Sequence, residues 1–176
     1  MCAIYAKKDD EYYMFYNIYA PNNHYDSVTF FYEVQEWLQE AVEIDSGMNI
    51  VLAGDFNIVM NPYTDSIGRS QSLQEKKVVS ILNKILTRYN LIDSYRLQNE
   101  FGGFTWGRDN PHIIRSRLDY IIISKSMKSN FLSCNTNIQP NESDHRTVYA
   151  EFEIDKINYG PGIIRGNAAL LDSYKD

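Results

Sequence analysis

The chain has 176 residues, 44% of them hydrophobic, and a formal net charge of −6. This length fits one domain that buries about 70% of its unfolded surface, so its core needs no disulfide or metal for stability. No apolar run approaches the about 20 residues of a membrane-spanning helix, and the charged residues 7–11 exclude the apolar core of a signal peptide. We therefore expect a reduced intracellular protein, nuclear or cytoplasmic, without a membrane partner, in which Cys2 and Cys134 are small core residues.

Charge is spread unevenly along the chain. Residues 1–68 carry 2 basic and 11 acidic side chains, residues 69–130 carry 11 and 5, and residues 131–176 carry 4 and 7, which gives −9, +6 and −3. The overall negative charge argues against a nucleic-acid partner, whereas the middle third predicts a basic face. The alternative is that these charges are scattered and solvated, because their order along the chain does not determine where side chains point.

The first half of the chain alternates between predicted strands and helices. Residues 12–19 are rich in β-formers and predict a strand inside a layered fold. From Asp26 the apolar residues follow helical spacing, with Asp26 or Ser27 as the N-cap. Residues 49–53 predict a short buried strand, and a capping box at residues 72–75 opens a second helix. The apolar faces of the two helices are Phe30, Val34, Trp37, Ala41 and Ile44, and Val78, Val79, Leu82, Ile85, Leu86 and Tyr89.

The second half of the chain predicts strands separated by loops rich in Gly, Asn, Pro and Ser. The strands are predicted at residues 104–106, 118–123, 131–138 and 146–154. In the last strand, one face consists of Val148, Ala150, Phe152 and Ile154. The residues that follow, 156–176, contain "GPG" and look like a linker, so the predicted domain covers residues 1–155.

Polar side chains suited to catalysis come at the ends of these strands or in the loops beyond them. They are Tyr19, Asn22, Asp55, Asn57, Thr105, Asp119, Asp144 and His145. Strand ends on one rim of a sheet converge, and a cluster of carboxylates, amides, hydroxyls and an imidazole suits phosphate chemistry with a divalent metal, because hard oxygen ligands hold Mg²⁺. Zinc fits less well, since His24 and His112 show no ligand spacing.

Most of these residues also have a purely structural interpretation. Asn22 and Asn57 fit turn positions, Asp144 and His145 fit a surface pair, and Asp119 fits a satisfied acid at a strand end. Tyr19 is one of 14 tyrosines, and Trp106 fits a core position better than a base-stacking one. The functional interpretation is stronger because it explains all the motifs and their order together.

Five segments in this order resemble the endonuclease/exonuclease/phosphatase superfamily, and most of all the apurinic-endonuclease-like nuclease domain of LINE-type retrotransposon polyproteins. They are "NIYAPN", "LAGDFN", "FTW", "RLDYIIIS" and "SDHR". The resemblance implies an α+β fold, a four-layer α/β/β/α sandwich of the deoxyribonuclease-I-like type. The tail "GPGIIRGNAALL" resembles the segment ahead of the reverse transcriptase in such polyproteins, which implies a reverse transcriptase domain as a partner within a parent polyprotein.

The resemblance further implies a metal-dependent endonuclease that hydrolyses the backbone of DNA with Mg²⁺ or Mn²⁺. In this chain Asp55 would orient or deprotonate the attacking water, and Asn57 would hydrogen-bond the scissile phosphate. His145 would stabilise transition-state charge, oriented and kept protonated by Asp119. Tyr19 would make a catalytic contact with the phosphate. Asn22, Thr105 and Ser143 would bind the substrate, the last two by bracing neighbouring loops. Asp144 would bind the metal, directly or through water.

The chain departs from the family pattern upstream of "NIYAPN". Members of the family begin with a strand that carries an asparagine and a second that carries a metal-binding glutamate, and neither is found here. "LQE" at 38–40 falls inside the first predicted helix, so we expect Glu40 to be a solvated helix residue. One sheet should be incomplete because the N-terminal strands are missing, which predicts exposed apolar surface, a raw strand edge and little activity for this chain alone.

Two other functions remain open from the sequence. One is a catalytically dead, truncated remnant that at most binds nucleic acid. The other is a phosphoesterase of the same superfamily that acts on a small molecule or a lipid, although no motif in the chain supports it.

Overall fold

The main element of the fold is a five-stranded sheet with the strand order β1-β2-β3-β8-β5. The structure is a computed structural model, which describes residues 2–8, 10–137 and 143–153. The strands of this sheet are β1 (Cys2–Lys8), β2 (Glu11–Tyr19), β3 (Asn49–Asp55), β5 (Leu91–Asp93) and β8 (Asp119–Ser124). β2 and β3 run parallel, and the other neighbouring pairs are antiparallel.

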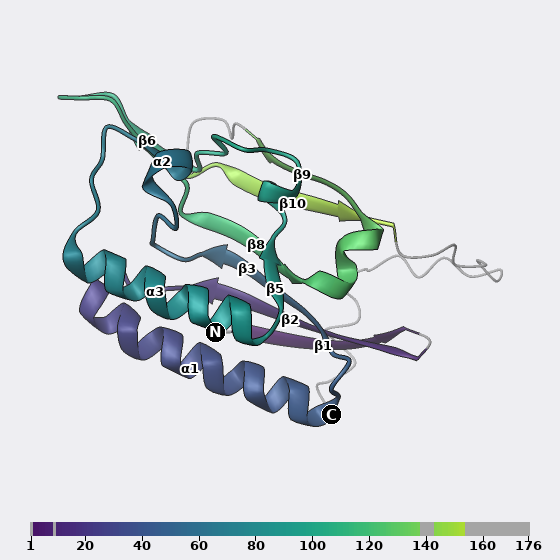
Figure 1. Cartoon of the computed structure of the whole chain (residues 1–176). Helices are drawn as coiled ribbons and strands as arrows, with labels where there is room; N and C mark the ends of the chain where they lie inside the picture. The colour runs from purple at the N-terminus through teal and green to yellow at the C-terminus, as the bar shows by residue number, and fades with distance from the viewer. Residues whose placement is uncertain (1, 9, 138–142, 154–176) are drawn as a thin grey trace, which may run out of the picture.

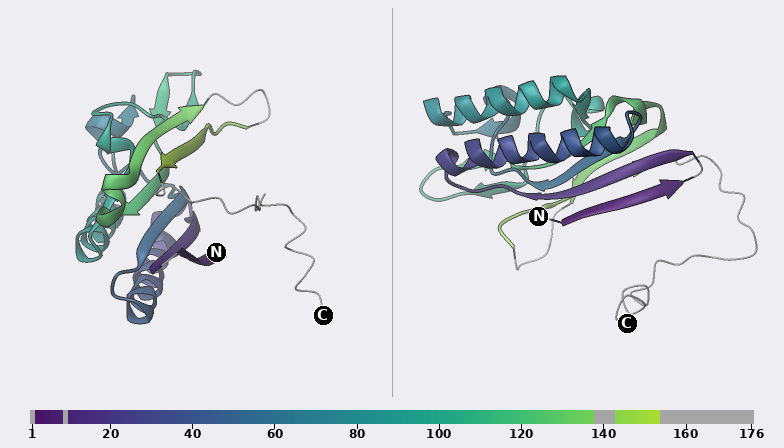
Figure 2. Two further views of the ribbon diagram at one scale, coloured as in Figure 1. Left: turned by 90° about the vertical axis from the view of Figure 1, so that its right-hand side faces the viewer. Right: turned by 90° about the horizontal axis from the view of Figure 1, so that it is seen from below.

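Two long helices, α1 (His24–Ile44) and α3 (Leu73–Arg88), lie side by side along one face of this sheet (Figures 1 and 2). Alternate strand residues point toward them, as expected for strands with a period of two. The core between the two layers includes Met14, Tyr16, Ile18, Ile50, Leu52 and Ile122 from the strands and Phe31, Val34, Leu38, Val78, Leu82 and Ile85 from the helices. Glu40 is exposed on α1, as predicted.

The two helices differ in how well their starts were predicted. Ser72 caps α3 as expected, and its hydroxyl accepts a hydrogen bond from the backbone N–H of Glu75 at 3.0 Å. The prediction for α1 was wrong, since Asp26 and Ser27 lie inside the helix and Asn23 is the N-cap. The Asn23 side chain accepts from the backbone N–H of residue 25 at 3.0 Å, so a cap closer to the preceding loop satisfies the first turn.

A second, two-stranded sheet lies on the opposite side of the main sheet from the helices (Figures 1 and 2). It consists of β9 (Phe131–Asn137) and β10 (Thr147–Phe152), paired antiparallel. Along β10, Val148, Ala150 and Phe152 are half-buried while Tyr149 and Glu151 are exposed, which confirms the predicted alternation. The predicted ends of these two strands, at residues 138 and 154, and the predicted linker lie outside the described residues.

A groove of about 280 Å³ separates the two sheets and is mostly apolar. Its lining includes Tyr13, Phe15, Val51, Ala53, Ile121 and Phe152. Phe15 is 40% exposed there, and β1 pairs with β2 alone among the described strands. The described residues thus place one layer of α-helices on one face of the main sheet and the two-stranded sheet on the other, and they leave exposed the apolar surface and the strand edge that were expected. None of the described helices combines the length and the hydropathy required to cross a membrane.

Several short elements were not predicted, because most of them have only two to four residues, which are too few for a periodic pattern. They are α2 (Pro62–Asp65), β4 (Ser66–Ile67), β6 (Trp106–Arg108), β7 (Ile114–Ser116) and the 3₁₀-helices at Tyr95–Leu97 and Lys125–Asn130. β4, β7 and β6 form a three-stranded sheet, so the strand predicted at residues 104–106 begins at its last residue. Figure 1 shows this sheet beyond one end of the main sheet.

A buried ion network links the small sheet to the main sheet. Arg117, only 2% exposed, donates to Asp65 at 2.9 Å and to Asp93 at 2.5 Å, and Arg96 also pairs with Asp65. Burial lowers the pKa of Arg117, but the Asp93 and Asp65 carboxylates raise it overall, so the guanidinium stays charged. Cys134 is buried with a free thiol, as predicted, and burial raises its pKa.

Candidate active site

Three of the predicted site residues lie at one end of the main sheet. Asp55 is the last residue of β3 and faces Asp119, the first residue of β8, in the antiparallel register. On its other side, Asp55 is in register with Tyr19, the last residue of β2. Gly54 has φ +133°, and a Cβ there would lie 2.1 Å from the Ile18 carbonyl oxygen. Only glycine lets β2 and β3 approach this closely next to Asp55.

The loop after β3 holds the Asp55 carboxylate in place. Its Oδ1 accepts a hydrogen bond from the backbone N–H of Asn57 at 2.8 Å. Asn57 adopts a left-handed conformation, φ +49°, and its side-chain amide donates to the Ala20 carbonyl at 2.7 Å. The Ala20 N–H donates in turn to the Asp55 carbonyl at 2.8 Å. Asn57 is therefore a turn residue that also fastens the loop after β2 to the site.

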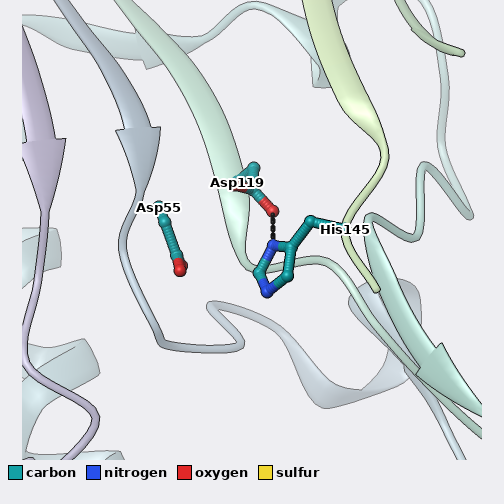
Figure 3. Close-up of side chains that lie close together, drawn as sticks. All are labelled: Asp55, Asp119 and His145. Carbon is teal, nitrogen blue, oxygen red and sulfur yellow. Dashed lines mark hydrogen bonds and ion pairs between the residues drawn. The ribbon is translucent and has the colours of Figure 1, made fainter. Parts of the chain in front are cut away.

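His145 and Asp119 form the contact expected between them. The imidazole Nδ1 lies 2.8 Å from Asp119 Oδ2, and Figure 3 shows Asp55 beside this pair. The buried Thr105 hydroxyl accepts from the backbone N–H groups of Leu118 and Asp119, at 3.0 and 3.1 Å. The Ser143 hydroxyl accepts from the His145 N–H at 3.1 Å. Both hydroxyls thus fix the backbone that carries the Asp119 and His145 side chains.

These residues surround a cleft of about 710 Å³. Its lining is Tyr19, Asn22, His24, Asp55, Asn57, Arg69, Trp106, Leu118, Asp119, Asp144 and His145. Tyr19 is 74% exposed, so its ring is accessible from solvent rather than packed in the core. Thr105 and Ser143 do not line this cleft but a smaller hollow of about 240 Å³ beside it.

Sequence reasoning did not assign four residues of this cleft to the site, which are His24, Arg69, Trp106 and Leu118. His24 is the first residue of α1, but the sequence prediction placed it in the loop ahead of that helix. The only indication that His24 lines the cleft was the nearby site residue Asn22. Trp106 directly follows Thr105 in "FTW", which was a usable signal. Arg69 had no local signal, since it reaches the cleft from the loop ahead of α3 while pairing with Glu75 at 2.8 Å.

The surroundings of Asp55 disfavour the charged form of its carboxyl. Burial raises the pKa of its carboxyl, and the negative charges of Asp119 and Asp144 raise it further. The Asn57 N–H and the His145 imidazole oppose this effect without cancelling it, so the pKa stays above its usual value. A carboxylate in such surroundings is a better proton acceptor than a solvated one.

The same residues offer donors to a metal ion. One carboxylate oxygen each of Asp55 and Asp119 and a ring nitrogen of His145 lie within 4.8 Å of one another. Asp144 is outside this group but lines the same cleft. An oxygen-rich donor set of this kind fits a divalent cation such as Mg²⁺ or Mn²⁺.

The chain belongs to the endonuclease/exonuclease/phosphatase family, whose model matches residues 12–145. The matched range contains all the residues that line the cleft. No curated protein matches the chain significantly.

Solved structures of DNA-processing enzymes have the same fold. The AP endonuclease LMAP from Leishmania major superposes with a TM-score of 0.72 at 16% identity, over 87% of this chain and 54% of that one. An AP endonuclease from Archaeoglobus fulgidus gives 0.63 at 20% identity, over 86% and 65%. The 3′ phosphatase NExo from Neisseria, bound to a product DNA hairpin, gives 0.61 at 21% identity, over 85% and 64%. The fold is thus the α+β deoxyribonuclease-I-like type, and the chain spans about half to two thirds of these proteins.

Proposed function

We propose that this protein is a metal-dependent phosphodiesterase of the endonuclease type that hydrolyses the backbone of DNA. The observation that carries the proposal is the Asp119–His145 pair, 2.8 Å apart, lying beside Asp55 in one cleft of a chain of this family. The similar solved structures, two AP endonucleases and a 3′ phosphatase bound to DNA, support DNA as the substrate class.

Each polar group of the cleft has a role in such a reaction. Asp55, with its raised pKa, accepts a proton from the water that attacks phosphorus while the bond to the sugar oxygen breaks. His145, oriented by Asp119, donates to a phosphate oxygen as negative charge develops there. Tyr19, Asn22 and Asn57 line the cleft and orient the phosphate.

Mg²⁺ or Mn²⁺ held by Asp144, directly or through water, would neutralise charge on the phosphate oxygens. The protein groups described above do not depend on the ion for their positions, because hydrogen bonds within the chain fix them. Asp55 is held by the Asn57 N–H, and His145 by Asp119 and Ser143.

A second hollow, of about 1100 Å³, supports a nucleic acid as the substrate, since Arg69 lines both this hollow and the cleft. Its basic residues, Arg69, Lys76, Arg96 and Arg117, all come from the positively charged middle third of the chain. The three arginines pair with acids, so attraction for a phosphate backbone depends mainly on the exposed Lys76. The basic face is therefore weaker than the sequence charge suggests.

The proposal extends to a retrotransposon-like nicking endonuclease. Its support is the sequence resemblance to LINE-type nuclease domains and the tail that resembles the segment ahead of a reverse transcriptase. In that setting a reverse transcriptase domain of the same polyprotein would use the nicked DNA.

The test is conversion of supercoiled plasmid to open circles with Mg²⁺ or Mn²⁺, with EDTA as a blank and at a protein concentration high enough to detect the weak nicking expected of this chain alone. Asp55→Asn and His145→Ala should lose nicking. Asp45→Asn is the matched control, because Asp45 also accepts from the N–H two residues ahead, that of Gly47, but lies at the far end of α1. DNA binding without nicking would support a dead remnant. Hydrolysis of small phosphodiesters or lipid headgroups without DNA cleavage would support the alternative phosphoesterase.

A further inference from the structure

Trp106 makes a contact that its position in the sequence did not predict. It is the first residue of β6, and its indole Nε1 donates a hydrogen bond to Asp144 Oδ2 at 2.9 Å. The ring is half-buried and lines the cleft beside Asp144, so it neither sits in the core nor extends freely into solvent. This contact joins segments that are 38 residues apart in the chain.

Backbone contacts reinforce the same junction. Trp106 and His145 form an isolated antiparallel β-bridge, and the Arg146 N–H donates to the Thr105 carbonyl at 2.7 Å. The start of β6 therefore holds the backbone around Asp144 while the indole holds its side chain. Asp144 is otherwise an exposed residue, whose side chain would be expected to change rotamer readily.

The chemistry of the indole determines what this contact does. An indole N–H is a donor only, so it holds a carboxylate by one oxygen and leaves the lone pairs of the other oxygen available. A carboxylate fixed in this way loses less conformational freedom when it binds a cation. Groups that hold a metal-ligating carboxylate in place typically contribute about 10- to 100-fold to metal affinity or activity.

We propose that Trp106 is a positioning residue that fixes the Asp144 carboxylate for binding of a divalent metal ion. The inference rests on the proposed function, since it takes Asp144 as a metal-binding group. It assigns to Trp106 a role through its N–H, which is distinct from packing or from stacking on a base.

The test uses variants that separate the N–H from the ring. Trp106→Phe keeps an aromatic ring without the donor, whereas Trp106→His restores an N–H, because Nε2 of histidine lies at nearly the same distance from Cβ as the indole nitrogen. Trp37→Phe is the matched control, since Trp37 packs on α1 against Phe30. Thermal unfolding of each variant establishes that it is folded.

The main measurement is Mn²⁺ binding to the free protein by calorimetry, without DNA. Trp106→Phe should weaken binding about tenfold or more, Trp106→His should recover part of the loss, and Trp37→Phe should bind as the unchanged protein does. In an Asp144→Ala background, Trp106→Phe should not weaken Mn²⁺ binding any further, because both substitutions remove the same contact. The indole N–H resonance of Trp106 in an NMR spectrum should also shift in Asp144→Ala.

Equal Mn²⁺ affinity for Trp106→Phe and the unchanged protein would overturn the proposal, as would additive effects of the two substitutions or an unmoved indole resonance. An unchanged protein that binds no Mn²⁺ would overturn both this inference and the metal dependence proposed above. If Mn²⁺ binding responds as expected but no DNA is cleaved, the positioning role stands and the proposed function fails.

Discussion

Replacing Asp119 by asparagine removes one negative charge from the candidate active site with little change in shape. The asparagine side chain retains an oxygen that can accept from His145 Nδ1, which lies 2.8 Å from the Asp119 carboxylate in the structure. The expected result is a lower kcat with a nearly unchanged KM for DNA, because the lost interaction acts mainly when charge develops on the phosphate.

The structure sets the size of this effect. Unit charges about 4 Å apart interact by about 4 kcal/mol at an effective dielectric constant of about 20. The side chains of His145 and Asp119 are 29% and 18% exposed, so solvent screening reduces the interaction. A loss of about 2 to 3 kcal/mol is expected after that reduction, which corresponds to about 30- to 150-fold in kcat.

Single-turnover cleavage of a short DNA duplex measures the rate constant of the chemical step, to which product release does not contribute. Asp119→Ala should lose more activity than Asp119→Asn, since it also releases the orientation of the imidazole. In a His145→Ala background, Asp119→Asn should have no further effect, because the two residues act as one unit. Unchanged kcat in Asp119→Asn, or a full additional loss in the His145→Ala background, would refute the reasoning.

Three further predictions address charge and stability. Because the pKa of Asp55 is raised, its ionised form costs stability above that pKa, and Asp55→Asn should unfold at a higher temperature than the unchanged protein at neutral pH. This difference should disappear as the pH falls through the folded pKa toward the unfolded value, and nicking should drop by at least about 100-fold. Lys76→Ala should lower the slope of log DNA affinity against log salt by about 1, whereas Lys77→Ala, exposed but outside the hollow, should not, as filter binding at several salt concentrations would show. Arg117→Met should destabilise the fold by about 3 to 5 kcal/mol and lower Tm by about 6 to 20 °C, because it leaves the buried Asp65 with fewer partners; an unchanged Tm in calorimetry would contradict this.

Patterns within a few residues were sufficient to predict many of the elements and the positions of the polar groups. The helical spacing of Val78, Leu82 and Ile85 together with the Ser72 cap gave α3 nearly to the residue. Strand β3 was predicted from its apolar run, although it continues through Gly54 to Asp55. Such signals are local, because a cap or a periodic face involves neighbours within one or two turns.

The contacts between these elements were decided only by the tertiary structure. The cap of α1 at Asn23 competes with two equally suitable neighbours, and the short strands of the small sheet exist only because they pair with one another. Arg69 reaches the cleft from a loop whose course no local pattern specifies.

The sequence by itself was enough to identify the candidate site residues, because Asp55, Asp119 and His145 each stand in or beside a predicted strand in a recognisable motif. Tertiary structure decided that Asp119 and His145, 26 residues apart, meet at 2.8 Å, and that Asp144 is bound by an indole rather than lying free. The physical reason is that hydrogen bonds between side chains depend on strand register and on loop geometry, where a shift of one residue reverses the face on which each side chain lies.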